Sequence, residues 1–178
     1  MQRTPKSEID ELTSRCLAAF VEAGSLDLSL DHLAAKVGIS KRMLIHYFGS
    51  REHLEVKAIE LLEERLRDRF KPERFPAGAS LQAVVTALWD QSTAPESRGV
   101  LLVIMDTTRR GWSGSERANL FYAEQQRLWV NLLLKFLPDA DAVEELLQLF
   151  QGAILAYLVT GDREKGRRAL ARMTSRYS

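Results

Sequence analysis

Apolar residues recur at intervals of three and four along most of the chain, which is the spacing that places side chains on one face of an α-helix. Gly, Pro and Ser positions interrupt this pattern and divide it into about nine helical segments. The expected helices cover residues 6–23, 29–37, 41–48, 51–70, 80–94, 97–111, 115–137, 141–160 and 163–176. The six apolar residues 100–105 also allow a β-strand, but no partner strand is visible, so we favour a buried helix there. The pattern therefore predicts an all-α protein.

The stretch from Ser29 to Leu54 predicts two short helices, a tight turn between them and the start of a third helix. A serine precedes each of these helices, where its hydroxyl can accept a hydrogen bond from a free backbone N–H group. Gly38 stands at the turn, a position that often requires a positive φ angle. Helix, glycine-containing turn and second helix form the helix-turn-helix pattern.

This stretch resembles the DNA-binding segment of the tetracycline-repressor (TetR) family of bacterial transcription regulators. The resemblance covers less than a third of the chain. The residues that carry it are Ser29, Leu33, Ala34, Val37, Gly38, Ile39, Ser40, Leu44, Tyr47, Phe48, Ser50, Arg51, Glu52 and Leu54. In such a unit the second helix enters the major groove of DNA.

The resemblance predicts which side chains contact DNA. Arg42 is the best candidate for bidentate binding of guanine, and Met43 and Ile45 can contact thymine methyl groups. Tyr47 and Arg51 occupy positions that usually contact phosphate in the family. The alternative is a solvated, charged helix without a DNA role. The complete candidate set is Ser29, Ser40, Lys41, Arg42, Met43, Ile45, His46, Tyr47 and Arg51.

Two positions depart from the usual family pattern. Arg42 replaces a small residue or proline, and Ile45 replaces a tyrosine that can hydrogen-bond to phosphate. We therefore expect Lys41, Tyr47 and Arg51 to make more of the backbone contacts. The operator sequence is not transferable from relatives.

The loop around Pro72, Pro76 and Gly78 indicates a domain boundary. We expect a DNA-binding domain over residues 1–54 and a helical regulatory and dimerisation domain over residues 55–178. The helix at 51–70 would join them.

The resemblance implies that the helices between residues 80 and 137 enclose a pocket for a small-molecule effector. Bulky aromatic side chains and methionine make an adaptable apolar wall, although ordinary core packing explains each of them equally well. The candidates are Trp89, Met105, Arg109, Trp112, Phe121, Gln125 and Trp129.

The helix at 141–160 is apolar on two faces and therefore needs two packing partners. We expect one of them to be a second copy of the chain. The predicted interface residues are Leu146, Phe150, Ala153, Ile154 and Tyr157. The basic helix at 163–176 either joins this interface or is a solvated surface.

Composition narrows the functional classes. The net charge of +1 gives no argument for DNA binding, but residues 36–51 contain four cations and no carboxylate. The N-terminus lacks the apolar core of a signal peptide, and the longest uncharged stretch, 146–161, is short and contains two glutamines. We therefore expect a cytoplasmic protein. Cys16, the single cysteine, is expected in the core.

No catalytic motif is visible, so we do not expect an enzyme. The spacing of His32, His46 and His53 does not favour a metal site, and no cofactor is expected. The predicted function is a ligand-responsive regulator, in most relatives a repressor, that binds a pseudo-palindromic operator as a homodimer and is released by a small apolar or amphipathic effector. A helical ligand-sequestering protein and an enzyme of unfamiliar type are the alternatives. The effector, the operator and the regulated genes do not follow from the sequence.

Overall fold

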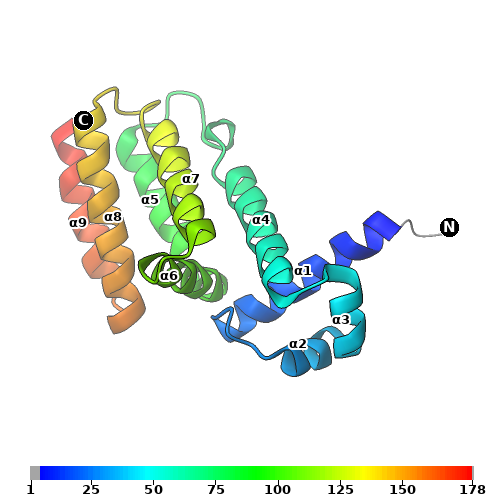
Figure 1. Ribbon diagram of the computed structural model, residues 1–178. Helices are drawn as coiled ribbons and strands as arrows, with labels where there is room; N and C mark the ends of the chain where they lie inside the picture. Colours follow the sequence, from blue (N-terminus) through cyan, green and yellow to red (C-terminus); the bar gives the residue numbers. More distant parts are fainter. Residues whose placement is uncertain (1–4, 178) are drawn as a thin grey trace. The chain divides into compact units, whose positions relative to one another are not determined.

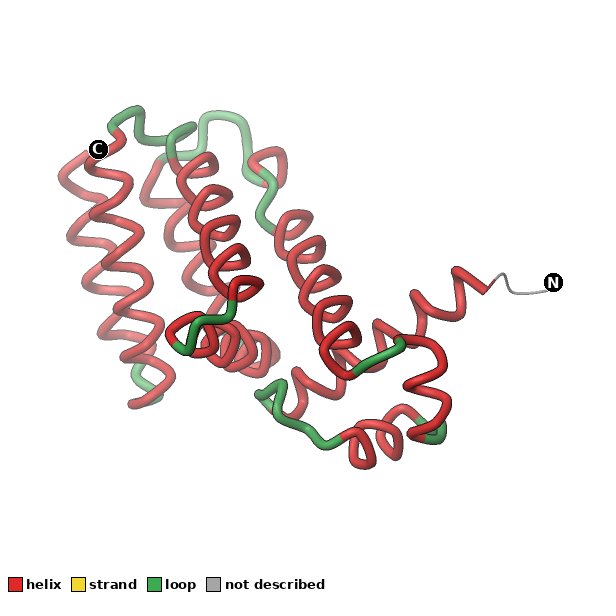
Figure 2. The backbone as a smooth tube through the Cα atoms, in the orientation of Figure 1, coloured by secondary structure: helices red, strands yellow, loops and turns green. Residues whose placement is uncertain are grey.

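The computed structural model describes residues 5–177 and confirms the all-α prediction (Figure 1). Within these residues there are nine α-helices, three short 3-10 helices and no strand (Figure 2). Residues 100–105, which also allowed a strand, lie within a helix. The helices are α1 (Pro5–Ala23), α2 (Leu30–Val37), α3 (Lys41–Phe48), α4 (Arg51–Arg69), α5 (Leu81–Ser92), α6 (Arg98–Trp112), α7 (Glu116–Leu133), α8 (Ala140–Thr160) and α9 (Arg163–Thr174).

The chain forms two compact units. The first contains the residues up to Leu66 together with Gly99–Tyr122, and the second contains Arg67–Arg98 together with the residues from Ala123 onward. This division differs from the expected ranges 1–54 and 55–178, because α6 and the start of α7 pack with the N-terminal helices. The residues that hold α6 there are 75 or more positions from α1 in the sequence, so local patterns do not indicate them.

The first unit has the small apolar core that the sequence pattern predicts. The side chains of Phe20, Leu33, Val37, Leu44 and Phe48 are all almost completely buried. Cys16 is also buried, as expected for a small core residue. The three N-terminal helices thereby cover a continuous apolar centre, which fixes the angle between α2 and α3.

Helix α6 lies in direct contact with the end of α1. A Cβ atom on Gly99 would lie 2.1 Å from the carbonyl oxygen of Val21, a distance that only a glycine permits. One turn further along α6, Leu102 covers Gly24. The first unit is therefore a helix-turn-helix domain with α6 packed onto it.

In the second unit, α9 packs against both α5 and α8, and α8 and α9 lie side by side (Figure 1). The indole ring of Trp89 is fully buried, and the glycine at position 166 lets α9 approach it. Tyr157 packs edge-on against Trp89 and donates a hydrogen bond to the carbonyl oxygen of Thr93 (3.1 Å). Arg163 and Arg167 of α9 pair with Asp90 of α5.

Helix α8, with 21 residues, is long and apolar enough to cross a membrane by length and composition alone. From the sequence we expected residues 146–161, the uncharged stretch that includes the end of this helix, to be too short and too polar to cross a membrane. Helix α8 is the one such helix within residues 5–177, and 39% of its most apolar window is buried inside the chain. Core helices of helical bundles have the same composition.

Candidate DNA-binding site

The ends of α2 and α3 have the geometry that the sequence predicts. The hydroxyl oxygens of Ser29 and Ser40 accept hydrogen bonds from the backbone N–H groups of His32 and Met43, each over 3.2 Å. Gly38 follows α2 with φ of 69°, in the left-handed region that glycine adopts without strain. Two hydrogen-bonded caps and this turn hold the two helices in the helix-turn-helix arrangement.

Helix α3 has one buried side and one exposed side. Leu44 and Phe48 are buried, whereas Lys41, Arg42, Met43, Ile45 and His46 are exposed. The large apolar side chains of Met43 and Ile45 are each 38% exposed. Tyr47 is half-buried and its ring packs edge-on against that of His46. The exposed side therefore combines cations with apolar groups, as contacts to base edges require.

The cations of the motif differ in their partners. Lys36 pairs with Glu22, Lys41 with Asp31, and Arg51 with Glu55. No ion pair is formed by Arg42 among the described residues, and its side chain is exposed. Arg42 is thus the cation of this motif that is free to contact a guanine or a phosphate without first losing a partner.

The guanidinium group of Arg51, expected at a phosphate contact, is hydrogen-bonded within the chain. It donates hydrogen bonds to the carbonyl oxygens of Leu28 (2.6 Å) and Leu26 (2.9 Å), and to Glu55 (2.8 Å). These bonds hold the segment that leads into α2. Because Leu28 and Leu26 are 23 and 25 positions away from Arg51, the motif alone does not indicate this role.

The histidines of the motif lie on helices of the helix-turn-helix unit and at the start of α4. His53 Nδ1 lies 2.9 Å from the carbonyl oxygen of Phe48, which places it at the turn between α3 and α4. Among residues 5–177, no group of three His, Cys, Asp or Glu side chains is arranged to hold a metal ion.

The expected pocket residues are distributed over both units. In the first unit, Phe121 is buried and Met105 is half-buried. Arg109 is paired with Asp106 and Asp27, and Trp112 has 84% of its surface exposed. Arg109 is therefore occupied by carboxylates, and Trp112 lies on the surface of its unit.

In the second unit, Trp89 and Trp129 belong to one aromatic cluster. The ring of Phe150 lies between them, with centroid distances of 5.7 Å to Trp89 and 5.9 Å to Trp129. The ring of Phe70 contacts Trp129 at 4.6 Å. The indole nitrogen of Trp89 and the amide nitrogen of Gln125 are buried without a hydrogen-bond partner. A buried donor without a partner, such as the Trp89 indole nitrogen in this cluster, can bind an acceptor group of a small molecule.

The expected interface residues on α8 mostly face the chain itself. Leu146, Ile154 and Tyr157 are buried by the helices of the second unit, and Phe150 and Ala153 are half-buried. The other apolar face of α8 is open: Leu155 is 56% and Val159 79% exposed. Both faces of this helix are apolar, so periodicity could not indicate which one the chain covers.

Comparison with known proteins agrees with this geometry. The HTH-type transcriptional regulator BetI of Rhizobium meliloti (strain 1021) is 29% identical over 144 residues, which are 77% of this chain and 69% of that protein. No family model matches the chain. A TetR-family transcriptional regulator from Streptomyces coelicolor superposes with a TM-score of 0.79 at 18% identity, covering 100% of this chain and 85% of the other. A transcriptional regulator from Rhodococcus sp. Rha1 gives a TM-score of 0.72 at 15% identity, covering 92% and 94%.

The capped helix-turn-helix and the exposed side of α3 have the form of a DNA-binding unit. More particularly, the chain has the fold of TetR-family transcriptional regulators of known structure, and its sequence is similar to that of an HTH-type transcriptional regulator. The proteins to which it is similar are regulators and not enzymes, in agreement with the sequence-based expectation.

Proposed function

We propose that the protein is a cytoplasmic repressor that binds a pseudo-palindromic operator as a homodimer and is released from it by a small apolar or amphipathic effector. The observation that carries the proposal is the side of α3 that combines the unpaired Arg42 with the exposed Met43 and Ile45. These three side chains offer one charged and two apolar contacts to bases of one half-site.

A homodimer is supported by the open face of α8. Leu155 and Val159 are exposed on the same side of the helix as Gly152 and Ala156, so a second helix can approach closely there. Apolar surface of this kind is unusual on a monomer and marks association. Two copies would place two recognition helices in successive major grooves, about 34–36 Å apart.

An effector site is supported by the aromatic cluster of Trp89, Trp129 and Phe150 with the unpaired donors of Trp89 and Gln125. The donors favour an effector that carries a carbonyl or ether oxygen on an apolar body. Binding would release DNA if the effector prefers the conformation that does not fit the operator.

The proposal is tested by selecting bound sequences from random double-stranded DNA, with and without a panel of small metabolites. A repressor of this type selects a palindrome with half-sites about one helical turn apart, and one compound abolishes the selection. Sequence-independent binding would instead favour the ligand-sequestering alternative. If transcription of the regulated genes falls when the gene for this protein is deleted, the protein is an activator and not a repressor.

A further inference from the structure

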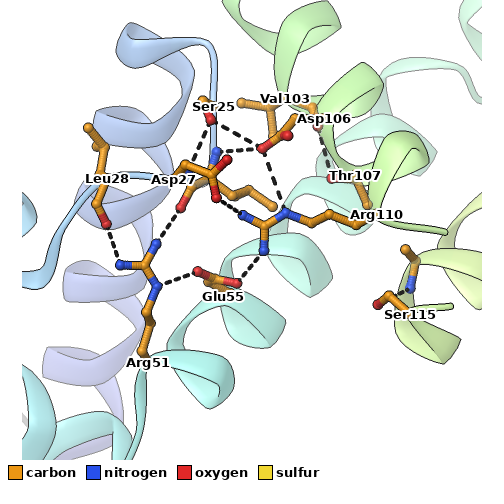
Figure 3. Close-up of polar contacts among 12 residues, drawn as sticks. Ser25, Asp27, Leu28, Arg51, Glu55, Val103, Asp106, Thr107, Arg110 and Ser115 are labelled. Atoms are coloured by element: carbon orange, nitrogen blue, oxygen red, sulfur yellow. Dashed lines mark hydrogen bonds and ion pairs between the residues drawn. The ribbon is translucent and has the colours of Figure 1, made fainter. Parts of the chain in front are cut away.

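The segment between α1 and α2, residues 24–29, is held by side chains from two other helices of the first unit (Figure 3). Leu26 is fully buried in this linker. Its N–H group donates to a carboxylate oxygen of Asp106 on α6 (2.9 Å), and its carbonyl oxygen accepts from Arg51 on α4 (2.9 Å). The hydroxyl of Ser25 also donates to Asp106 (3.2 Å). Both backbone polar groups of the buried residue Leu26 are thus satisfied from outside the linker.

Arg110 of α6 connects the same linker to α4 (Figure 3). Its Nη1 atom donates to Glu55 (2.8 Å), and its Nη2 atom donates to Asp27 in the linker (2.7 Å). Its Nε atom lies 3.7 Å from a carboxylate oxygen of Asp106. One guanidinium therefore faces three carboxylates, which come from α4, the linker and α6. A planar group with several fixed donors is suited to such bridging.

The cluster is balanced in charge and partly desolvated. The carboxylates of Asp27, Glu55 and Asp106 face the guanidinium groups of Arg51, Arg109 and Arg110. The side chains of Arg110 and Glu55 are only 25% and 14% exposed, so their pairing is less screened than that of ordinary surface ion pairs. The side chain of Asp27 is largely exposed, so its ion pair with Arg110 orients the linker but contributes little to the free energy of unfolding.

We infer that Arg110 is a positioning residue for operator binding, because it holds the linker and α4 in the arrangement that orients α2 and α3. Arg110 is not on the DNA-binding helices, and it acts through Asp27 and Glu55. The linker ends at Ser29, the cap of α2, so a shift of α6 is transmitted directly to the start of the helix-turn-helix. The inference rests on the proposed function, because the orientation of α3 has a consequence only in a protein that binds DNA.

A merely stabilising ion pair in the same unit provides a matched control. Arg117 of α7 donates to Glu63 of α4 over 2.9 Å, and the two side chains are 31% and 10% exposed. This pair has nearly the length and burial of the Arg110–Glu55 pair, but neither of its residues bonds to the linker. Loss of Arg117 should lower the thermal unfolding midpoint without weakening operator binding, whereas loss of Arg110 should lower both.

The experiment compares operator affinity of the full chain with Arg110→Gln, Arg110→Lys and Arg117→Gln, using the DNA that the unmodified protein selects. Arg110→Gln should weaken binding by about tenfold, since coupled networks of this kind contribute that much. The slope of affinity against salt should stay unchanged, because no phosphate contact is lost. Arg110→Lys should not restore binding, because an ammonium group cannot bridge the carboxylates in this way. Equal affinities for Arg110→Gln and Arg117→Gln would overturn the inference.

Amide hydrogen exchange on the protein without DNA gives an independent measurement. Arg110→Gln should accelerate exchange at Leu26 and in α2 by about tenfold, whereas Arg117→Gln should not. Unchanged exchange at these amides would overturn the inference. If Arg110→Gln accelerates exchange at these amides but the unmodified protein selects no operator, the proposed function is contradicted. The contact between Arg110 and the linker would still hold in that case.

Discussion

Lys41 Nζ lies 3.0 Å from a carboxylate oxygen of Asp31, so the first turn of α3 is tied to the first turn of α2 by an ion pair. Both side chains are more than half exposed, which makes the pair weak in water. A phosphate group near α3 would compete with Asp31 for this ammonium group. The pair therefore opposes DNA binding slightly while it helps to fix the angle between the two helices.

Asp31→Asn should strengthen operator binding by about threefold at low salt, because Lys41 is released and one negative charge is removed near the phosphates. Titrations by fluorescence anisotropy at several salt concentrations measure this effect, which should vanish at high salt. Glu60→Gln, which breaks the Lys57–Glu60 pair on α4, is the control and should leave affinity unchanged. Weaker binding by Asp31→Asn would show that the pair supports the bound conformation.

Arg42→Ala should reduce discrimination at one base pair of each half-site by about 1–3 kcal/mol, the contribution of a bidentate arginine contact to guanine. Lys41→Ala should instead weaken binding to all sequences and reduce the salt slope by about one phosphate contact. Affinities for a set of single-base variants of the selected operator separate the two effects. If neither substitution changes operator binding, α3 is not the recognition helix.

Leu155→Asp should shift the protein from dimer to monomer, because a carboxylate would be buried without a partner on the open face of α8. Sedimentation velocity measures the change, and operator affinity should fall with it. Leu120→Asp on α7 is a matched control, since Leu120 is 57% and Leu155 56% exposed. A dimer that survives the α8 substitution but not the α7 substitution would move the interface to α7.

Gly166→Ala should destabilise the second unit. The added methyl carbon would lie 2.4 Å from the indole ring of Trp89, which is fully buried and has no room to move away. Overpacking of this kind costs about 1–3 kcal/mol and is measured as a loss in the free energy of unfolding. Gly152→Ala on α8 meets no atom of its own chain within 4 Å and should be neutral or stabilising when both glycine variants are measured in a Leu155→Asp protein, which lacks the proposed α8 interface. Equal effects of the two substitutions would contradict the contact with Trp89.

The buried thiol of Cys16 makes the free energy of unfolding depend on pH in the alkaline range. Burial raises the pKa of its thiol to about 11, and the charge of Arg15 lowers it by less. In the unfolded chain the thiol loses its proton at lower pH, so the folded state binds more protons between the two pKa values. Stability is therefore fully present below the unfolded pKa and is lost as the pH rises toward 11, by up to about 1.4 kcal/mol per pH unit. Cys16→Ala, which cannot titrate, should show a shallower fall in urea-unfolding experiments over this range; parallel curves would contradict the raised pKa.

Features set by neighbouring residues were predictable from the sequence. The serines before α2, α3, α4 and α5 each accept a hydrogen bond from a backbone N–H group three residues later, as the cap pattern predicts. The pattern also predicted the nine helices, because helical periodicity is a local property.

Features set by distant residues were not predictable. Asp106 and Arg110 look like ordinary polar positions near the end of a helix, and only the fold brings them to Leu26 and Glu55. The same limit applies to α8, where Ile154 and Leu155 are equally apolar but only one of them is covered by the chain.

The bond between the Leu26 amide and Asp106 joins residues 80 positions apart, and this has a consequence for synthesis on the ribosome. The linker obtains its partners only after α6 has left the exit tunnel, because Asp106 and Arg110 are made long after α2 and α3. A nascent chain that ends near Leu66 leaves the Leu26 amide and the Glu55 carboxylate without these partners. If Arg110 positions the helix-turn-helix as inferred, an interrupted translation product that ends before α6 would bind the operator more weakly than the finished chain.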